Sequence, residues 1–269
     1  MKNKSETLSS VMLMAVGIVG SIILWYVVVK FTPIKAFNRL PDPVTVMLEW
    51  ISRDPSYGLS IFTKDYYLHI WYSTYRAFTS FFLAVLLGVP LGIMMGWKVK
   101  VHKYSSALIG LLRPIPPLAW VPVAILIFPG TEPAVIYVTF LVAFFATTMN
   151  TLLGVQSIDD DYFRAAKCLG AKSKDILFDI VVPGALPSMF TGLQIAMGAA
   201  WFSLVAGEMI AAQYGLGFMI LESYNLVQYP TIVIMMATLG IVGYLSSAGI
   251  RYVGNRLMRW RQEIIGAMG

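Results

Sequence analysis

The chain has 269 residues, of which 58% are hydrophobic and 13% are charged, and its formal net charge is +6. Soluble domains carry roughly 25% charged residues, so this composition excludes an ordinary water-soluble domain and indicates a membrane protein with several spans. The single cysteine, Cys168, excludes an intramolecular disulfide and a cysteine-based metal site. The two histidines, His69 and His102, are far apart and fall in expected loops, which argues against a histidine metal site.

Six apolar stretches have about the 20 residues that a membrane-spanning helix requires. They cover residues 11–31, 73–97, 108–128, 134–155, 189–211 and 231–253. The fold class that they predict is an all-α membrane protein with six transmembrane helices. A cleaved signal peptide is the alternative for the first stretch, but the stretch is longer than a signal-peptide core and no small-x-small cleavage site follows it.

Between these stretches the chain shows one short amphipathic pattern and one interruption. Val44, Met47, Leu48 and Ile51 have helical spacing and predict a short helix at the membrane surface. Prolines in the run 113–117 interrupt the third stretch, because proline lacks a backbone donor. No internal repeat, low-complexity run or linker divides residues 1–269, which predicts a single transmembrane domain.

The distribution of Lys and Arg predicts the orientation of the chain. If the N-terminus is cytoplasmic, 13 of these cations lie in the inner segments and 4 in the outer ones, all of them in the first outer loop. Cytoplasmic loops of membrane proteins carry an excess of Lys and Arg. Both termini and the segment 156–188 are therefore predicted to be cytoplasmic, and the basic balance requires no nucleic acid partner.

The segment 156–188 has the pattern of two short helices joined by a sharp turn. Asp159 begins a run of three acids where a helix start carries partial positive charge, and Gly170 stands where a helix end favours positive φ. Ser173 is expected to cap the second helix, and Pro183 and Pro187 are expected to end it. Apolar residues follow helical periodicity at Tyr162, Ala165, Ala166 and Leu169, and again at Ile176, Leu177, Ile180 and Val181.

This segment resembles the EAA loop of the membrane subunits of bacterial ABC importers. The family pattern is Glu-Ala-Ala, three residues, Gly, nine residues, Ile, one residue, Leu-Pro. Ala165, Ala166, Gly170 and Ile180 match it, and Val182-Pro183 replaces Leu-Pro. Arg164 stands in place of the Glu, which reverses a charge, so the salt bridges of that Glu do not carry over to this chain.

Two further blocks are similar to the sulfonate, taurine, nitrate and bicarbonate importers of this family. The first is the proline-rich block 112–122, and the second is 201–220, which contains Glu208 and the run Gly215-Leu216-Gly217. A Trp-Phe-Gly that usually follows the proline-rich span is absent, and Ile127-Phe128-Pro129 stands there instead. The first hundred residues match only in hydropathy.

The resemblance implies the permease fold of type I ABC importers, with a cytoplasmic coupling-helix loop at 156–188. It also implies four kinds of partner: two cytoplasmic ATPase subunits, a second permease copy (most simply a homodimer), an extracytoplasmic solute-binding protein and the lipid of the inner membrane. No Gly-x4-Gly-Lys-Ser/Thr phosphate cradle occurs in the chain. ATP and Mg are therefore expected on the partner ATPase, and no cofactor is expected in this non-catalytic chain. Small oxyanions or organic sulfonates are the implied solutes.

The residues that the resemblance assigns to ATPase coupling are Tyr162, Arg164, Ala165, Ala166, Leu169, Gly170, Ala171, Ile180 and Pro183. Small residues allow a close approach to a partner surface, and the glycine allows a tight reversal of the chain. The alternative is an ordinary cytoplasmic loop that packs only on its own chain.

Candidate residues of the translocation path are Arg113, Pro117, Trp120, Asn150, Trp201 and Glu208. Irregular backbone at membrane depth is tolerated where it lines protein or a water-filled cavity. The alternatives remain open for each: the prolines shape helix packing, and Asn150 and Trp201 pack between helices. In the alternative for Glu208, this residue is an interfacial acid that caps a loop. In the alternative for Arg76 and Arg113, the two side chains reach lipid headgroups by snorkelling.

Two other function classes compete with the permease subunit. A secondary transporter or channel that works alone is expected to show repeated halves and paired intramembrane charges, and the sequence indicates neither. A membrane-embedded enzyme is expected to show clustered His, Asp or Glu within the spans, and the sequence offers the isolated Glu208.

Overall fold

The computed structural model describes residues 4–31 and 39–258, and all regular secondary structure within them is helical. Four cations that enter the orientation argument, Lys2, Lys35, Arg259 and Arg261, lie outside these residues. The chain forms two compact units: Met1–Leu68 with Met219–Ala237, and His69–Phe218 with Thr238–Gly269. Three helices run through both units: α3 (Lys64–Trp97), α10 (Leu216–Asn225) and α11 (Tyr229–Leu257).

The first unit contains α1 (Lys4–Phe31) and the short α2 (Pro43–Trp50). Asp42 caps α2, since its carboxylate accepts hydrogen bonds from the N–H groups of Val44 and Thr45, both at 2.9 Å. The Thr45 N–H bond above all lowers the pKa of Asp42, because it stabilises the charged form. The helix predicted near residue 44 is confirmed, and its stripe Val44, Met47, Leu48 and Ile51 is exposed.

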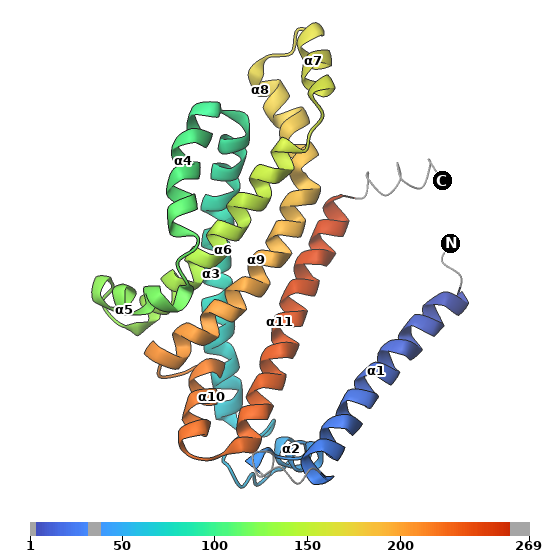
Figure 1. Ribbon diagram of the computed structural model, residues 1–269, viewed down its shortest axis with the longest axis vertical. Coiled ribbons are helices and arrows are strands. Elements are labelled where there is room, and N and C mark those ends of the chain that lie inside the picture. Colours follow the sequence, from blue (N-terminus) through green and yellow to red (C-terminus); the bar gives the residue numbers. More distant parts are fainter. Residues whose placement is uncertain (1–3, 32–38, 259–269) are drawn as a thin grey trace. The chain divides into compact units, whose positions relative to one another are not determined.

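The second unit contains most of the remaining helices (Figure 1). In chain order they are α4 (Val99–Leu112), α5 (Pro117–Ile127), α6 (Thr131–Gln156), α7 (Asp160–Cys168), α8 (Ser173–Asp175), the π-helix η2 (Ile176–Val181) and α9 (Val182–Ala211). Figure 1 shows α6 and α9 side by side, with α7 at one end of them.

Four described helical stretches are long and apolar enough to cross a membrane: Lys64–Trp97, Thr131–Gln156, Ser173–Ala211 and Tyr229–Leu257. The third predicted span, 108–128, is wrong as a single helix, because α4 and α5 are bent by 98° at the proline-rich run. Each proline there removes a backbone donor and disfavours helical dihedrals in the residue before it. The apolar part of α1, Ala15–Phe31, is shorter than the four, so six spans are not confirmed.

The second helix of the 156–188 segment does not end at Pro183 or Pro187, which corrects the sequence prediction. Both prolines lie inside α9, and the helical stretch continues from Ser173 to Ala211. The π-helix η2 comes directly before Pro183. Its wider turn changes the hydrogen-bond register by one residue, so the missing N–H of Pro183 falls where the ladder is already offset.

Helix α6 is the central element of the second unit. In its most apolar window 56% of the residues are buried, against 22–33% in the other three candidate spans. Helix α9 approaches α6 closely at Gly192, where an added Cβ would lie 2.2 Å from Cβ of Asn150. Gly198, on the same helix, has no atom within 4 Å of such a Cβ. The contact between α6 and α9 therefore requires the absence of a side chain at Gly192.

These two glycines give a matched test of the α6–α9 contact. We expect Gly192→Ala to lower the free energy of unfolding by about 1–3 kcal/mol, because the added methyl overpacks the contact. Gly198→Ala should be neutral or raise it by up to about 1 kcal/mol, since alanine favours helix. Unfolding of the detergent-solubilised variants checks this, and equal stabilities would contradict the packing described.

Candidate functional site

The turn after α7 has the geometry of a complete helix-terminating motif. Gly170 has a φ of 79°, its N–H donates to the carbonyl of Lys167, and the N–H of Ala171 donates to the carbonyl of Ala166, both at 3.0 Å. These two bonds define a Schellman motif, which requires positive φ at the glycine position. At the other end of α7, Asp159 accepts a hydrogen bond from the N–H of Asp161 at 2.9 Å. The predicted turn and helix start are thus confirmed.

The start of the second short helix differs from the sequence prediction. Ser173 is the first residue of α8 and not its cap. Asp175 supports this start instead, because its carboxylate accepts a hydrogen bond from the N–H of Lys172 at 3.0 Å. The negative carboxylate also lies near the positive end of the helix dipole and stabilises the helix start there. The neutral hydroxyl of Ser173 lacks this electrostatic contribution.

One side of the α7–α8 loop is anchored in the second unit. Ala166, Ile176 and Val181 are buried in a cluster with residues of α6 and α9, and Ala171 and Ile180 pack against that cluster. Phe163 also contacts it, with its ring 6.1 Å from that of Trp97. Pro183 lies in the first turn of α9 and is partly buried. These contacts hold the loop as a rigid projection.

The other side of α7 is exposed and mixes apolar with charged residues. Tyr162, Arg164, Ala165 and Leu169 are exposed, and the side chain of Leu169 has 87% of its surface accessible. Arg164 pairs with Asp161 at 3.2 Å, but both side chains are at least 75% exposed, so the pair contributes little stability. The predicted set therefore divides into residues that anchor the loop and residues that face away from this chain.

A buried ion cluster lies at the end of the second unit opposite α7. Its centre is Arg76 of α3, which is completely buried. The guanidinium pairs with Glu208 of α9 at 2.7 Å, and it binds Glu132 in the first turn of α6 through Nε at 2.7 Å and through Nη2. Its Nη1 also donates to the carbonyl of Tyr214 at 2.6 Å. One arginine of α3 thus joins the start of α6 to the end of α9.

Glu208 is also completely buried, and hydrogen bonds satisfy its carboxylate. The Ser73 hydroxyl lies 2.8 and 2.9 Å from the two carboxylate oxygens, and the N–H of Gly217 donates at 2.9 Å. Ser73 in turn accepts from the N–H of Leu216 at 2.8 Å. A buried charge is tolerated only with such partners, so the cluster fixes the turn between α9 and α10.

Gly215 and Gly217 make room for this cluster. A Cβ on Gly215 would lie 2.5 Å from the Glu208 carboxylate, and one on Gly217 would lie 2.6 Å from the carbonyl of Val205. Beside them, Nδ1 of His69 accepts a hydrogen bond from the N–H of Gly215 at 3.0 Å. The block of sequence around Glu208 therefore has a structural reason for its glycines.

Several expectations from the sequence are corrected at these residues. Neither histidine lies in a loop, since His69 is buried in α3 and His102 lies in α4. Arg76 does not reach toward headgroups, because it is completely buried and pairs with Glu208 within helices long enough to span a membrane. Glu208 accepts from the N–H of Gly217 in the turn after α9, as a loop-capping acid would, but it is buried and paired and not isolated. The prediction that the spans hold no paired charges is corrected with them. The opposite charges of Arg76 and Glu208, each near the end of an apolar stretch, were the available signal.

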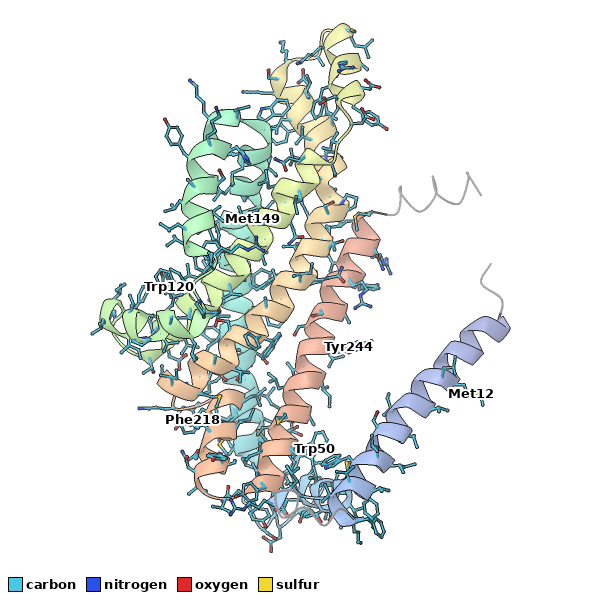
Figure 2. All side chains as sticks on the ribbon, viewed as in Figure 1. Met12, Trp50, Trp120, Met149, Phe218 and Tyr244 are labelled. Carbon is cyan, nitrogen blue, oxygen red and sulfur yellow. The ribbon has the colours of Figure 1, made fainter. Side chains whose placement is uncertain are left out.

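The structure brings three of the candidate path residues together. Arg113, Pro117 and Trp120 line one pocket of about 220 Å³ at the break between α4 and α5. Figure 2 labels Trp120 among the side chains. Trp201 is buried against Gly243 of α11. Glu208 belongs to the ion cluster, and its place on a path stays a prediction.

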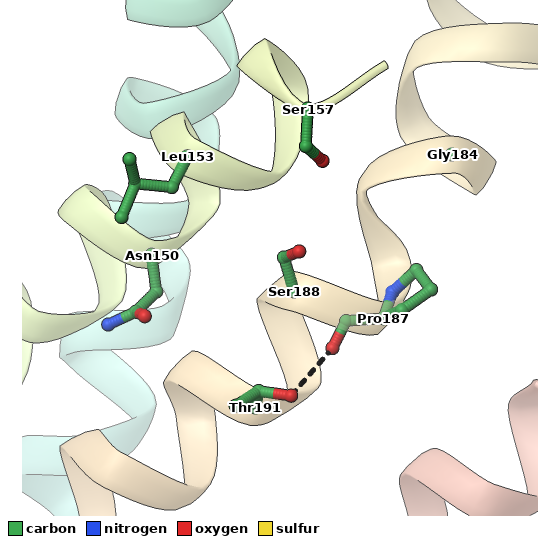
Figure 3. Close-up of a pocket in the computed structure, with 7 residues that line it drawn as sticks. All are labelled: Asn150, Leu153, Ser157, Gly184, Pro187, Ser188 and Thr191. Carbon is green, nitrogen blue, oxygen red and sulfur yellow. Dashed lines mark hydrogen bonds between the residues drawn. The ribbon is translucent and has the colours of Figure 1, made fainter. Parts of the chain in front are cut away.

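Asn150 lines a different pocket, of about 560 Å³, between α6 and α9 (Figure 3). Its neighbours there include three hydroxyl residues, Ser157, Ser188 and Thr191. The Thr191 hydroxyl donates to the carbonyl of Pro187 at 3.0 Å, and the Asn150 amide donates to the carbonyl of Ala146 at 2.8 Å. The lining is uncharged and mixes these polar side chains with Leu153, Gly184 and Pro187. Among the described residues no group of three His, Cys, Asp or Glu could hold a metal ion.

The ion cluster gives a direct stability prediction. Arg76→Met should lower the free energy of unfolding by about 3–5 kcal/mol, because it leaves Glu208 buried without its counter-ion. The matched control is Arg164→Met, which breaks an exposed pair and should cost at most about 1 kcal/mol. Chemical unfolding in detergent measures both, and Glu208→Gln added to Arg76→Met should recover part of the loss. A loss at Arg76 no larger than that at Arg164 would contradict the description of the cluster.

Comparison with known proteins places this geometry in a family. Residues 88–260 match the model of the binding-protein-dependent transport system inner membrane component. The taurine transport system permease protein TauC of Escherichia coli is 37% identical over 196 residues, which cover 73% of this chain and 71% of that protein. The bicarbonate transport system permease protein CmpB of Synechococcus elongatus is 31% identical over 265 residues, covering 97% and 92%.

A solved inward-facing structure of the MetNI methionine ABC transporter has a similar fold. It aligns with a TM-score of 0.59 at 23% identity, covering 71% of this chain and 93% of that one. Together with the match over residues 88–260, these similarities confirm the resemblance found in the sequence. The chain belongs to the family of binding-protein-dependent transport system inner membrane components, the permeases of ABC transporters.

Proposed function

We propose that this chain is the permease subunit of an ABC importer and that α7 receives the movement of a cytoplasmic ATPase. The observation that carries the proposal is the division of α7 into two faces. Ala166 and its neighbours fix the helix to α6 and α9, while Tyr162, Ala165 and Leu169 are exposed. An exposed apolar face on a rigid projection is typical of a surface that docks a partner protein.

The orientation that this function requires follows from charge. Lys167, Lys172 and Lys174 lie in the α7–α8 loop with Arg164, and cytoplasmic loops of membrane proteins are enriched in such cations. With this loop in the cytoplasm, the ion cluster of Arg76 lies at the opposite, extracytoplasmic end of the second unit. The distribution of Lys and Arg along the sequence leads us to propose that both termini are cytoplasmic as well.

The helical path from α7 to the membrane supports the transfer of movement. The stretch Ser173–Ala211 is helical without a break, so a displacement at the loop reaches the part of α9 that packs on α6. The polar pocket around Asn150 lies between these same two helices. We therefore place part of the translocation path there, between this chain and a second permease copy.

The remaining partners and the solute follow from the family. A binding protein would deliver the solute from outside, two ATPase subunits would bind ATP and Mg, and the simplest second permease is another copy of this chain. The relatives are named for taurine and bicarbonate transport. We infer a small oxyanion or sulfonate as the solute class for this chain.

Substitutions at Gly170 test the coupling assignment. Gly170→Val should abolish solute uptake and weaken co-purification of the ATPase, because a β-branched residue at a φ of 79° costs about 1–3 kcal/mol and distorts the end of α7. No atom lies within 4 Å of a Cβ added at this position, so the cost is one of backbone conformation alone. The measurements are uptake into cells and ATPase recovery with the purified membrane protein.

The matched control is Gly170→Asn, since asparagine adopts positive φ more readily than other residues with a side chain. It should retain most of the uptake and ATPase recovery. Insertion of both variants into the membrane should match that of the unmodified chain. Normal uptake in Gly170→Val would overturn the assignment of α7 as the coupling helix.

A further inference from the structure

The break between α4 and α5 forms a pocket whose only charge is positive. Seven residues line its volume of about 220 Å³: Arg113, Ile115, Pro117, Trp120, Val142, Phe145 and Ala146. Arg113 is the charged member, and none of the seven is acidic. No carboxylate of the described residues lies within 4.0 Å of the Arg113 guanidinium, whereas Arg76 and Arg164 each have such a partner. Arg113 is exposed, so the pocket carries an accessible, unpaired cation beside an apolar wall.

Trp120 supplies an unused hydrogen-bond donor to the same pocket. Its indole N–H is buried and has no hydrogen-bond partner in the described structure. An indole nitrogen only donates, and buried donors in folded proteins nearly always have an acceptor. Since the side chain lines the pocket, an acceptor that enters the pocket would supply the missing partner.

The backbone at the pocket favours negative charge as well. Helix α5 begins at Pro117, and no side chain caps its N-terminus. The N-terminal end of a helix carries partial positive charge. Few N–H groups are free at this helix start, because Pro117 has none and the N–H of Ala119 donates to the carbonyl of Pro116 at 3.0 Å. Half-helices that begin at membrane depth use this end to hold anionic groups in several transporter folds. The helix end, the guanidinium and the indole N–H thus favour the same class of ligand.

We propose that this pocket is an oxyanion-binding subsite of the translocation path, in which Arg113 provides the charge and Trp120 the hydrogen bond. The proposal rests on the proposed function, and it names residues that hold the solute inside the permease. A small sulfonate or bicarbonate has oxygens for both donors, and its charge balances Arg113. The apolar wall formed by Val142, Phe145 and Ala146 of α6 excludes a large hydration shell.

Arg113 has two other candidate roles, and each predicts a different experimental result from solute binding. A lipid phosphate is also an oxyanion, so an anionic headgroup could occupy the same donors. Arg113 also stands at the C-terminal end of α4, where a cation interacts favourably with the helix dipole. If Arg113 only interacts with the helix dipole, its substitution changes the stability of the protein and not oxyanion binding. If Arg113 binds a lipid headgroup, that contact is absent from a membrane without anionic lipid.

The test titrates the purified full-length chain, in nanodiscs of phosphatidylcholine, with sodium methanesulfonate and with sodium bicarbonate at fixed pH. Sodium chloride at equal ionic strength is the reference. We expect a saturable rise in melting temperature and a saturable change in tryptophan fluorescence with the two oxyanions. Arg113→Gln should weaken the apparent affinity about tenfold or more, since a charge-assisted bond is lost. Arg113→Lys should retain part of the affinity.

Trp120→Phe should weaken the affinity by about three- to tenfold, the effect of one hydrogen bond, and should remove the fluorescence change. The matched control is Lys103→Gln, which neutralises an exposed cation on α4 and should leave both signals unchanged. The melting temperature of each variant without oxyanion separates a loss of folding from a loss of binding.

Three results would overturn the proposal. One is the absence of a saturable response in the unmodified chain. Another is a response that Arg113→Gln and Trp120→Phe leave intact. The third is a response that disappears when phosphatidylglycerol is added, because the site would then belong to a lipid headgroup.

Failure of this proposal is distinguishable from failure of the proposed function. Arg113 lies in the second unit at the α4–α5 break and not in α7, so Arg113→Gln should recover as much ATPase as the unmodified chain. If Arg113→Gln binds oxyanions normally and Gly170→Val loses ATPase recovery, the subsite proposal is overturned and the proposed permease function stands. ATPase absent from every preparation would instead remove the permease function.

Discussion

The ion pair between Arg76 and Glu208 is the constraint on which the second unit depends. A guanidinium and a carboxylate, both completely buried, are stable there only if each finds a counter-charge and enough hydrogen bonds. Arg76 obtains these from α6 and α9 together, and Glu208 obtains them from Ser73 and the N–H of Gly217. The cluster therefore fixes the start of α6 and the end of α9 against α3. It also fixes the turn that follows α9. That turn requires glycine at positions 215 and 217, because a side chain there would collide with Glu208 or with the backbone of α9.

The opposite end of the same helices is fixed by packing and not by charge. Ala166, Ile176 and Val181 bury the inner face of the loop, and the Schellman motif at Gly170 determines where α7 ends. Between the two ends, α9 lies against α6 without a side chain at Gly192. A displacement applied to α7 would thus act on a stiff pair of helices. The pockets around Asn150 and Arg113 both include residues of α6, so the proposed path lies along the element that such a displacement would move.

Hydropathy and local turn chemistry predict the parts of this fold that depend on neighbours in sequence. The spans around 134–155 and 231–253, the break at 113–117 and the glycine turn at Gly170 follow from such patterns. The ion pair joins residues 132 positions apart, and an isolated charge in an apolar stretch does not identify its partner. Likewise, the prolines at 183 and 187 predicted a helix end, because sequence alone does not reveal the π-helix that precedes them. That residues 1–269 form one transmembrane domain, and that the path includes Glu208 or Trp201, stay predictions.

The central claim is that α7 lies in the cytoplasm and is covered there by an ATPase. Cys168 is the only cysteine in the chain, it lies at the end of α7 and it is exposed, so the unmodified protein carries its own probe. A membrane-impermeant maleimide should modify Cys168 in inside-out vesicles and not in right-side-out vesicles. Vesicles that retain the bound ATPase should react more slowly than vesicles stripped of it. Modification from the outside, or a rate that the ATPase does not change, would contradict the account.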